Sequence, residues 1–126
     1  MSKKIVYSAQ APEPIGPYSQ AVNVGNMLFI SGQIAIQKPS GVLITENIID
    51  ETQQVMLNLA AILKAADMDF SHVVKSTIFL KDFNDFANVN EIYGKCFPQN
   101  PPARETVEVS RLPKDVNVEI SCIAVK

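Results

Sequence analysis

Two residues of opposite charge interrupt the strand-like C-terminal segment of this 126-residue chain. The segment PPARETVEVSRLPKDVNVEISCIAVK runs from Pro101 to Lys126 and contains Arg104 and Glu119. If both side chains lie on one face of a sheet, their Cβ atoms are about 4.5–8 Å apart, and a small molecule could contact the guanidinium and the carboxylate together. The alternative is a solvated cross-strand ion pair, which contributes about 0–1 kcal/mol.

Alternation of apolar and polar residues predicts two strands in this segment, one around Val107 and one around Ile120. Antiparallel pairing that puts both apolar rows on one face fixes the parity of the register. The opposite face then carries Arg104, Thr106, Glu119 and Ser121. Because the apolar Ile123 and Val125 continue that opposite face, we expect another subunit to cover it.

The preceding segments predict an α+β fold. Strand-like composition covers residues 3–8, 19–24, 27–33 and 72–82, and Gly25-Asn26 has the two-residue spacing of a tight hairpin. Apolar residues at three- and four-residue spacing predict helices over 47–66 and 85–97, with Asn47 as the first N-cap and Asp67 as its left-handed end. The order is therefore β-β-β-α-β-α-β-β. Two amphipathic helices must bury their apolar faces, so we expect both on one face of a mixed sheet.

Length, composition and charge narrow the class of protein. We expect a single domain over residues 1–126, because a chain of this length with 47% hydrophobic residues can form one core. The net charge of −2 offers no basic surface for a nucleic-acid partner. No segment approaches the roughly 18 apolar residues that span a membrane, and the N-terminus lacks a signal-peptide pattern, so we expect no membrane partner and a cytoplasmic location.

The cysteines and the single histidine offer little for catalysis. Cys96 and Cys122 have neither a disulfide framework nor metal-ligand spacing, which predicts two free thiols that are buried or half-buried. A histidine-based metal site or a Ser-His-Asp triad would depend on His72 alone. His72 lies between a predicted helix and a strand, where a solvated or capping role is expected.

Four segments resemble the Rid (YjgF) family, and in particular its RidA branch, the 2-iminobutanoate/2-iminopropanoate deaminases. They are IGPYSQA (15–21), FISGQI (29–34), VNEIYGKCF (89–97) and PPARETVEVSRLPKDVNVEISCIAV (101–125). The resemblance covers nearly the whole chain. It implies a chorismate-mutase-like α+β fold and a homotrimer with three active sites in the clefts between subunits. It also implies hydrolysis of enamine and imine acids (2-aminoacrylate, 2-iminopropanoate, 2-iminobutanoate) to 2-oxo acids and ammonia.

The resemblance also implies roles for individual residues. Arg104 matches the arginine that holds the substrate carboxylate, and Glu119 matches the acid associated with water activation. The residues that match pocket positions are Tyr18, Ser31, Gly32, Asn90 and Thr106. Thr106 stands where the family often has cysteine, but that position is expected to contribute its backbone amide. Glu105, where a small residue is frequent, should point to the other face and leaves substrate preference open.

The residue types fit such a reaction. Arginine binds both oxygens of a carboxylate through its planar fork, and a glutamate can accept a proton from water and return one to the leaving amine. The imine carbon is already electrophilic, so no cofactor and no metal are expected. An enamine would first need protonation at C3, for which Glu119 acting through water is one candidate donor.

Other interpretations stay open. Tyr18 could simply anchor a turn, Gly32 could mark a bulge, and Asn90 could be a surface residue. A noncatalytic protein could use the Arg104 pocket to bind a small carboxylate, because a shared fold does not require a shared activity. Ribonuclease activity, claimed for relatives, fits the negative charge and the lack of aromatic-basic clusters poorly.

Overall fold

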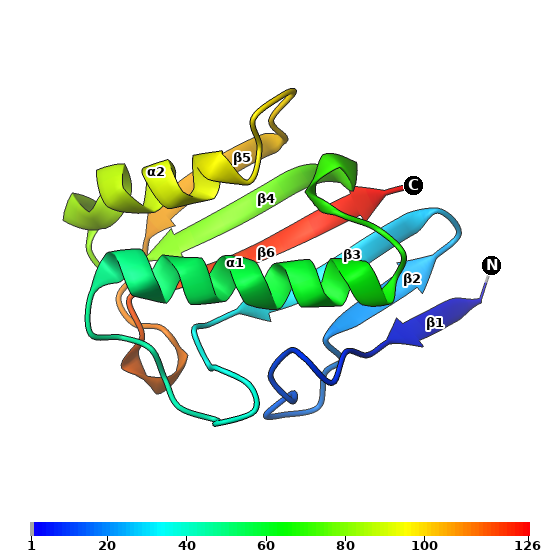
Figure 1. Ribbon diagram of the computed structural model, residues 1–126, viewed down its shortest axis with the longest axis horizontal. Coiled ribbons are helices and arrows are strands. Elements are labelled where there is room, and N and C mark those ends of the chain that lie inside the picture. Colours follow the sequence, from blue (N-terminus) through cyan, green and yellow to red (C-terminus); the bar gives the residue numbers. More distant parts are fainter. Residues whose placement is uncertain (1) are drawn as a thin grey trace.

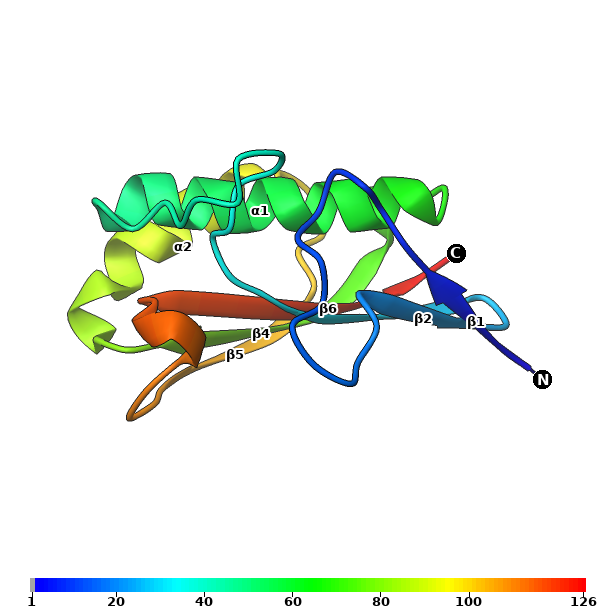
Figure 2. The same ribbon diagram turned by 90° about the horizontal axis from the view of Figure 1, so that it is seen from below.

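In the computed structural model, which describes residues 2–126, one six-stranded sheet carries two helices on a single face (Figures 1 and 2). The strands are β1 (Lys3–Val6), β2 (Ala21–Val24), β3 (Met27–Gln33), β4 (Val73–Leu80), β5 (Ala103–Glu108) and β6 (Val118–Val125). The helices are α1 (Ile48–Ala65) and α2 (Phe86–Lys95). Their order along the chain is the predicted order. Both helices also lie on one face, as their amphipathic patterns require.

Local signals set the element ends where the sequence predicts them. The side chain of Asn47 caps α1 by accepting a hydrogen bond from the Asp50 backbone N–H at 2.8 Å. Asp67, just past the helix, has the predicted left-handed backbone with φ of 57°. The β2–β3 hairpin turns at Gly25, where φ is 61° and glycine costs least.

The sheet order is β1-β2-β3-β6-β4-β5, with β4 and β5 parallel and the other neighbours antiparallel. The predicted antiparallel pairing of the last two strands is therefore wrong, because β4 lies between β5 and β6. Parallel neighbours need a long crossover, usually a helix, and α2 supplies it between β4 and β5. The connection between β5 and β6 is short enough for a hairpin, but the β4-α2-β5 crossover places β4 between these two strands.

This topology also changes which side chains share a face. Ser76 of β4 is the register partner of Arg104 on one side and of Cys122 on the other, so all three point toward the helices. Glu119, three residues before Cys122, points to the opposite face, which we call the open face. The expectation that Arg104 and Glu119 share a face within one chain is wrong. Val107 is also on the open face, as the partner of Phe79, and not beside Ile120.

The core lies between the helices and the sheet. Val55, Leu59, Ile62 and Leu63 of α1 are fully buried against the helix-facing side chains of the sheet, such as Ile120. Removing a side chain of this kind from water stabilises the fold by about 1.5–3 kcal/mol. No comparable layer of helices covers the open face in the described part of the chain (Figure 2). Within residues 2–126, no helix combines the length and hydropathy needed to cross a bilayer.

Polar residues inside the core hold the irregular segments in place. The buried carboxylate of Glu51 on α1 accepts hydrogen bonds from the backbone and side-chain N–H groups of Asn117, each at 2.7 Å, just before β6. The Asn58 side chain donates to the carbonyls of Ile34 and Ile36, each at 3.0 Å. These bonds tie the start of β6 and the segment after β3 to the same helix, so the two strands that carry Gly32 and Glu119 keep a fixed relation.

Candidate functional site

Four of the predicted site residues meet in an open pocket of about 350 Å³ on the open face. We call this group the glutamate half-site: Tyr18, Ser31, Gly32 and Glu119. Its other walls are apolar and come from Ile15, Ile34 and Pro113. Part of the segment between β1 and β2 lies on this side of the sheet, which brings Tyr18 to strands β3 and β6 (Figure 2).

Gly32 has a steric role in the glutamate half-site. The pairing of β3 with β6 shifts register between Ile30 and Gln33, so β3 has one extra residue in the stretch that contains Gly32. The Glu119 side chain lies directly over this backbone. A Cβ atom on Gly32 would overlap Glu119 Oε2 and lie 2.8 Å from its Cδ. Glycine here is what allows the carboxylate to occupy this position.

Ser31 and Tyr18 form hydrogen bonds that stabilise the rim of the glutamate half-site. Ser31 donates its backbone N–H to the Gln20 carbonyl at 2.9 Å and its hydroxyl to the Ser19 carbonyl at 2.6 Å. The Tyr18 hydroxyl accepts the Ile15 N–H at 3.2 Å, so Tyr18 does anchor a turn. Its side chain nevertheless remains 48% exposed at the pocket. Anchoring and lining the pocket are therefore compatible.

The environment of Glu119 favours its protonated form. Burial raises the pKa of Glu119 above the ordinary value of 4.5, because desolvation penalises the carboxylate. A carboxyl group with a raised pKa can exchange protons closer to neutral pH than an exposed glutamate can. Proton transfer is the chemistry that this half-site supports.

The other three predicted residues lie on the helix side of β5. We call them the arginine half-site: Asn90, Arg104 and Thr106. Arg104 donates from Nη1 to Asn90 Oδ1 at 2.7 Å. Its guanidinium carbon lies 5.1 Å from the ring centre of Tyr93 and 5.8 Å from that of Phe86. The Thr106 hydroxyl is buried without a hydrogen-bond partner among the described residues.

Arg104 differs from Arg111, the other arginine, in having no acidic partner among the described residues. Arg111 forms a 2.7 Å ion pair with Asp115. Among residues 2–126, no carboxylate forms a salt bridge with Arg104. A half-buried guanidinium held by an amide and two rings keeps its charge available, and a carboxylate or phosphate group is the ligand that matches its geometry.

Sequence reasoning missed the two aromatic contacts of Arg104. Phe86 and Tyr93 belong to the apolar residues whose spacing predicts the second helix, and Asn90 lies beside them. The three positions are spaced i, i+4 and i+7, which places them on one face of α2. That spacing was the available signal. Without the β4-β5 pairing, nothing in the sequence says that Arg104 lies against this face.

Glu105 points away from Arg104, as expected. On the open face it forms a 3.0 Å ion pair with Lys75 and accepts a 2.8 Å hydrogen bond from the Thr77 hydroxyl. The hydrogen bond from Lys75, followed by that from Thr77, lowers the pKa of Glu105. Glu105 therefore favours its ionised form and lies on the same face of the sheet as the glutamate half-site. It does not belong to the arginine half-site.

Other polar features have structural roles or lie apart. His72 Nδ1 accepts the Asp69 N–H at 3.0 Å in a capping box, which confirms the capping role. Cys96 and Cys122 are free, and burial raises the pKa of Cys122 to about 11, so its thiol stays protonated at neutral pH. No group of three or more His, Cys, Asp or Glu side chains in residues 2–126 is arranged to hold a metal ion.

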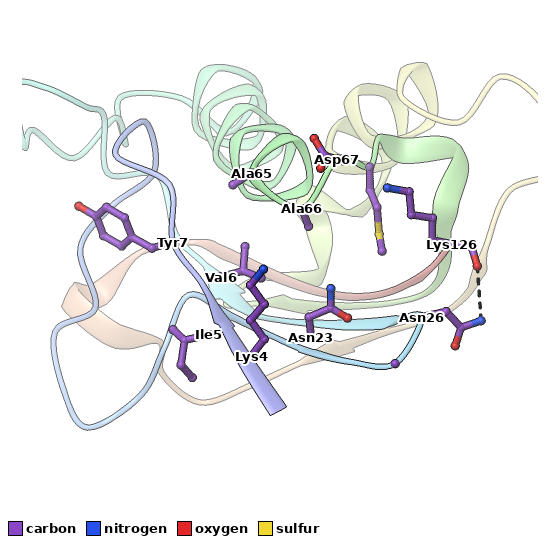
Figure 3. A pocket seen from close by; sticks show the side chains of 12 residues that line it. Lys4, Ile5, Val6, Tyr7, Asn23, Asn26, Ala65, Ala66, Asp67 and Lys126 are labelled. Atoms are coloured by element: carbon purple, nitrogen blue, oxygen red, sulfur yellow. Dashed lines mark hydrogen bonds between the residues drawn. The ribbon is translucent and has the colours of Figure 1, made fainter. Parts of the chain in front are cut away.

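A larger hollow of about 590 Å³ lies where β1 and the β2–β3 turn meet the end of α1 (Figure 3). Lys4, Asn23, Asp67 and Lys126 line it, and the Asn26 side chain donates to the Lys126 carbonyl at 3.4 Å. None of the seven predicted site residues is among its lining residues. The larger volume of this hollow therefore does not identify it as the functional site. The predicted site residues lie in the two half-sites.

Residues 8–126 match the family model described as endoribonuclease L-PSP, and the chain belongs to this family, the YjgF/Rid family. A RutC family protein of Pyrococcus horikoshii is 52% identical over 98% of both chains. The mouse protein named 2-iminobutanoate/2-iminopropanoate deaminase is 46% identical over 98% of this chain and 92% of its own. The structure of Escherichia coli TdcF with bound serine has a TM-score of 0.93 and 40% identity, covering 98% of both chains. The α+β fold implied by the resemblance agrees with these findings.

Proposed function

We propose that this protein hydrolyses reactive 2-imino and enamine acids, such as 2-iminopropanoate and 2-iminobutanoate, to 2-oxo acids and ammonia. The observation that carries the proposal is the presence, in one chain, of two incomplete half-sites with complementary chemistry. One holds an arginine that forms no salt bridge within residues 2–126, and the other holds a half-buried glutamate with a raised pKa. A carboxylate substrate that needs water activation requires both groups. The name of the mouse relative gives the same imino acids, and the serine bound to TdcF is likewise a small carboxylate.

The two half-sites would complete each other between subunits. Because Arg104 and Glu119 lie on opposite faces of one sheet, a single chain cannot present both to one small molecule. The open face has the apolar surface of an interface, with Phe29 and Val107 each 41% exposed. We therefore propose a homotrimer in which one subunit supplies the arginine half-site and its neighbour supplies the glutamate half-site.

The reaction then follows from the positions of the two groups. Arg104 binds the carboxylate of the imine and orients C2 toward the Glu119 carboxylate of the neighbouring subunit. Glu119 takes a proton from water as the water oxygen attacks C2 of the protonated imine, which gives a tetrahedral carbinolamine. The same carboxyl group returns the proton to nitrogen. The C–N bond then breaks as the carbinolamine hydroxyl releases its proton to solvent and becomes the carbonyl, and the 2-oxo acid and ammonia leave. One water is consumed for each ammonia released, and Glu119 ends in its starting form.

The proposed reaction needs no cofactor, because the C=N carbon is electrophilic without further activation. Enamines such as 2-aminoacrylate must first gain a proton at C3 to become imines. Protonated Glu119 acting through water is a candidate for that donor, since burial raises its pKa and so favours the protonated form more than in an exposed glutamate. The small substrates and the acidic chain favour a protein that acts on metabolites without nucleic acid or membrane.

The alternative is a noncatalytic protein that binds small carboxylates at the arginine half-site. The absence of an acidic partner for Arg104 among the described residues fits binding as well as catalysis. A protein that only binds carboxylates does not need a carboxyl group with a raised pKa at the opposing half-site. The presence of Glu119 therefore favours catalysis over binding alone.

The test generates 2-iminopropanoate from alanine with an amino-acid oxidase and follows its decay. We expect Arg104→Ala to lower kcat/KM about 10²–10³-fold, mainly through KM, because it removes a desolvated charge partner of the substrate. Glu119→Gln should lower kcat about 10²–10⁴-fold. The control is Arg111→Ala, which removes an exposed arginine outside both half-sites. If the wild-type protein and Arg104→Ala clear the imine equally slowly, the protein is not a deaminase, and carboxylate binding by the wild type alone would support the noncatalytic alternative.

A further inference from the structure

The aromatic face of α2 beneath Arg104 has no role in the reaction described above. Phe86 and Tyr93 flank Asn90 on that face, and α2 runs alongside β4 and β5 (Figure 1). The guanidinium carbon of Arg104 lies within 6 Å of both ring centres, at 5.8 Å and 5.1 Å. At such distances a cation is attracted by the negative faces of the rings.

The two rings are themselves held by other aromatic residues. Phe86 stacks on Phe83 with ring centres 5.0 Å apart and planes 17° from parallel. Tyr93 is 4% exposed and packs on Phe97 at 4.7 Å. Phe97 in turn meets the edge of Phe70 at 5.4 Å. The platform under Arg104 is thus continuous with the core, which limits how far either ring can move.

The chemistry of this support matters for an arginine that must bind an anion. A neighbouring carboxylate would also hold the guanidinium, but that carboxylate would occupy the N–H donors of Arg104 and neutralise its charge. Aromatic faces and the Asn90 oxygen attract the cation without neutralising it. One N–H of Arg104 is committed to Asn90, and the planar group keeps further donors for a ligand.

We propose that Phe86 and Tyr93 are positioning residues that hold the Arg104 guanidinium in its carboxylate-binding orientation while leaving its charge free. Their effect on turnover rests on the proposed function, whereas their effect on carboxylate binding does not. Asn90 then acts through Arg104, by fixing one edge of the guanidinium. The Tyr93 hydroxyl is buried without a hydrogen-bond partner among the described residues, so we expect this role to require the ring alone.

The first experiment measures the platform in the free protein. The Arg104 Nε–H signal is assigned in the ¹⁵N NMR spectrum by its loss in Arg104→Ala. We expect the nearby rings to shift this proton from the ordinary arginine position, and Phe86→Leu or Tyr93→Leu to move it back. Tyr93→Phe should leave it in place. Phe70→Leu, which removes a ring of the same cluster that does not touch Arg104, is the control for lost packing.

The second experiment measures the consequence for ligands, with 2-oxobutanoate as the carboxylate probe and 2-iminobutanoate as the substrate. We expect Phe86→Leu and Tyr93→Leu to raise Kd and KM about 2- to 30-fold with little change in kcat, and Tyr93→Phe to behave as wild type. In an Arg104→Ala background, the leucine substitutions should add nothing, because their effect passes through Arg104. A purely structural role would instead change Tm without this coupling.

The outcomes separate this proposal from the proposed function. If no variant, including the wild type, turns over the imine but the 2-oxobutanoate Kd follows the expected pattern, the deaminase function fails and the platform stands. If folded Phe86→Leu protein binds 2-oxobutanoate and turns over imine as the wild type does, the platform proposal is wrong. Phe86 is half-buried, so this variant keeps the test available if Tyr93→Leu fails to fold.

Discussion

The two half-sites use different means to present a charged group. The glutamate half-site lies at the centre of the sheet, where the missing side chain of Gly32 leaves space for the Glu119 carboxylate and burial raises the pKa of Glu119. The arginine half-site lies on the edge strand β5, where α2 supplies two rings and an amide to Arg104. In both half-sites, the ionisable group has no ionic partner among the described residues.

The difference between them matches the tasks that we propose. A group that moves protons benefits from desolvation, which brings its pKa toward neutral pH. A group that binds an anion must remain charged, and neutral supports hold it in place without weakening it. The sheet separates the two within one chain, so the proposed reaction requires a second subunit.

The largest expected effect comes from mixing two inactive variants. Arg104→Ala and Glu119→Gln chains, denatured together in equal amounts and refolded, should regain about a quarter of wild-type activity, since a site between subunits receives an intact residue from each side with that probability. The measurement is the rate of imine decay at equal total protein. A site contained within one chain would give no recovery.

A second mixture provides the control for that experiment. Wild-type chains refolded with an equal amount of the double variant should also retain about a quarter of the activity if sites lie between subunits, but about half if each chain carries a whole site. Arg104→Ala refolded with the double variant should stay inactive. Activity in that last mixture would show that Arg104 is not required.

Gly32→Ala should have an intermediate effect confined to the glutamate half-site. The added methyl overlaps Glu119 Oε2, which is the far end of a flexible side chain, so the carboxylate swings away and the fold survives. We expect kcat to fall about 10- to 100-fold, as small misplacements of catalytic groups do. Gly94→Ala is the matched control, because a Cβ there meets no atom within 4 Å. Full activity in Gly32→Ala would show that the observed position of Glu119 is not the working one.

The smallest expected effect is in the pH dependence. Glu119 must be deprotonated to act as a base, so kcat/KM should fall as the pH drops through its raised pKa, with a midpoint above 4.5. The same shift means that the folded protein holds this proton more tightly than the unfolded chain does. The stability linked to it is present below the ordinary pKa and is lost as the pH rises through the raised pKa.

Glu119→Gln removes the pH-dependent contribution of this carboxyl group to stability, so the difference from the wild type measures that contribution. The variant should be at least as stable as the wild type at pH 7, and the difference in Tm should shrink toward pH 4, where both proteins carry a neutral side chain at this position. Melting curves over that range provide the measurement. A variant markedly less stable than the wild type at pH 7 would mean that the ionised carboxylate stabilises the fold, against the desolvation argument.

Short-range patterns predicted most elements of the fold. The 3.6-residue period of α1, its Asn47 cap and the Gly25 hairpin turn each depend on residues within a few positions, and the structure confirms them. Alternation singled out Arg104 and Glu119, and the resemblance implied roles for all seven site residues. The structure gathers them into two clusters, and their roles stay predictions. The pairing of β5 with β4 was missed, because alternation alone does not say which strand lies beside which.

The chain's local chemistry was therefore enough to specify the helices, the strands and the types of reactive group, since propensity, capping and periodicity act over a few residues. Which faces those groups occupy depended on the β4-α2-β5 crossover and on Ser76 pairing with both Arg104 and Cys122. Such contacts join residues far apart in sequence, and a one-residue change of register reverses every side chain. Only the assembled sheet places Arg104 on the rings of α2 and Glu119 over Gly32, on opposite faces.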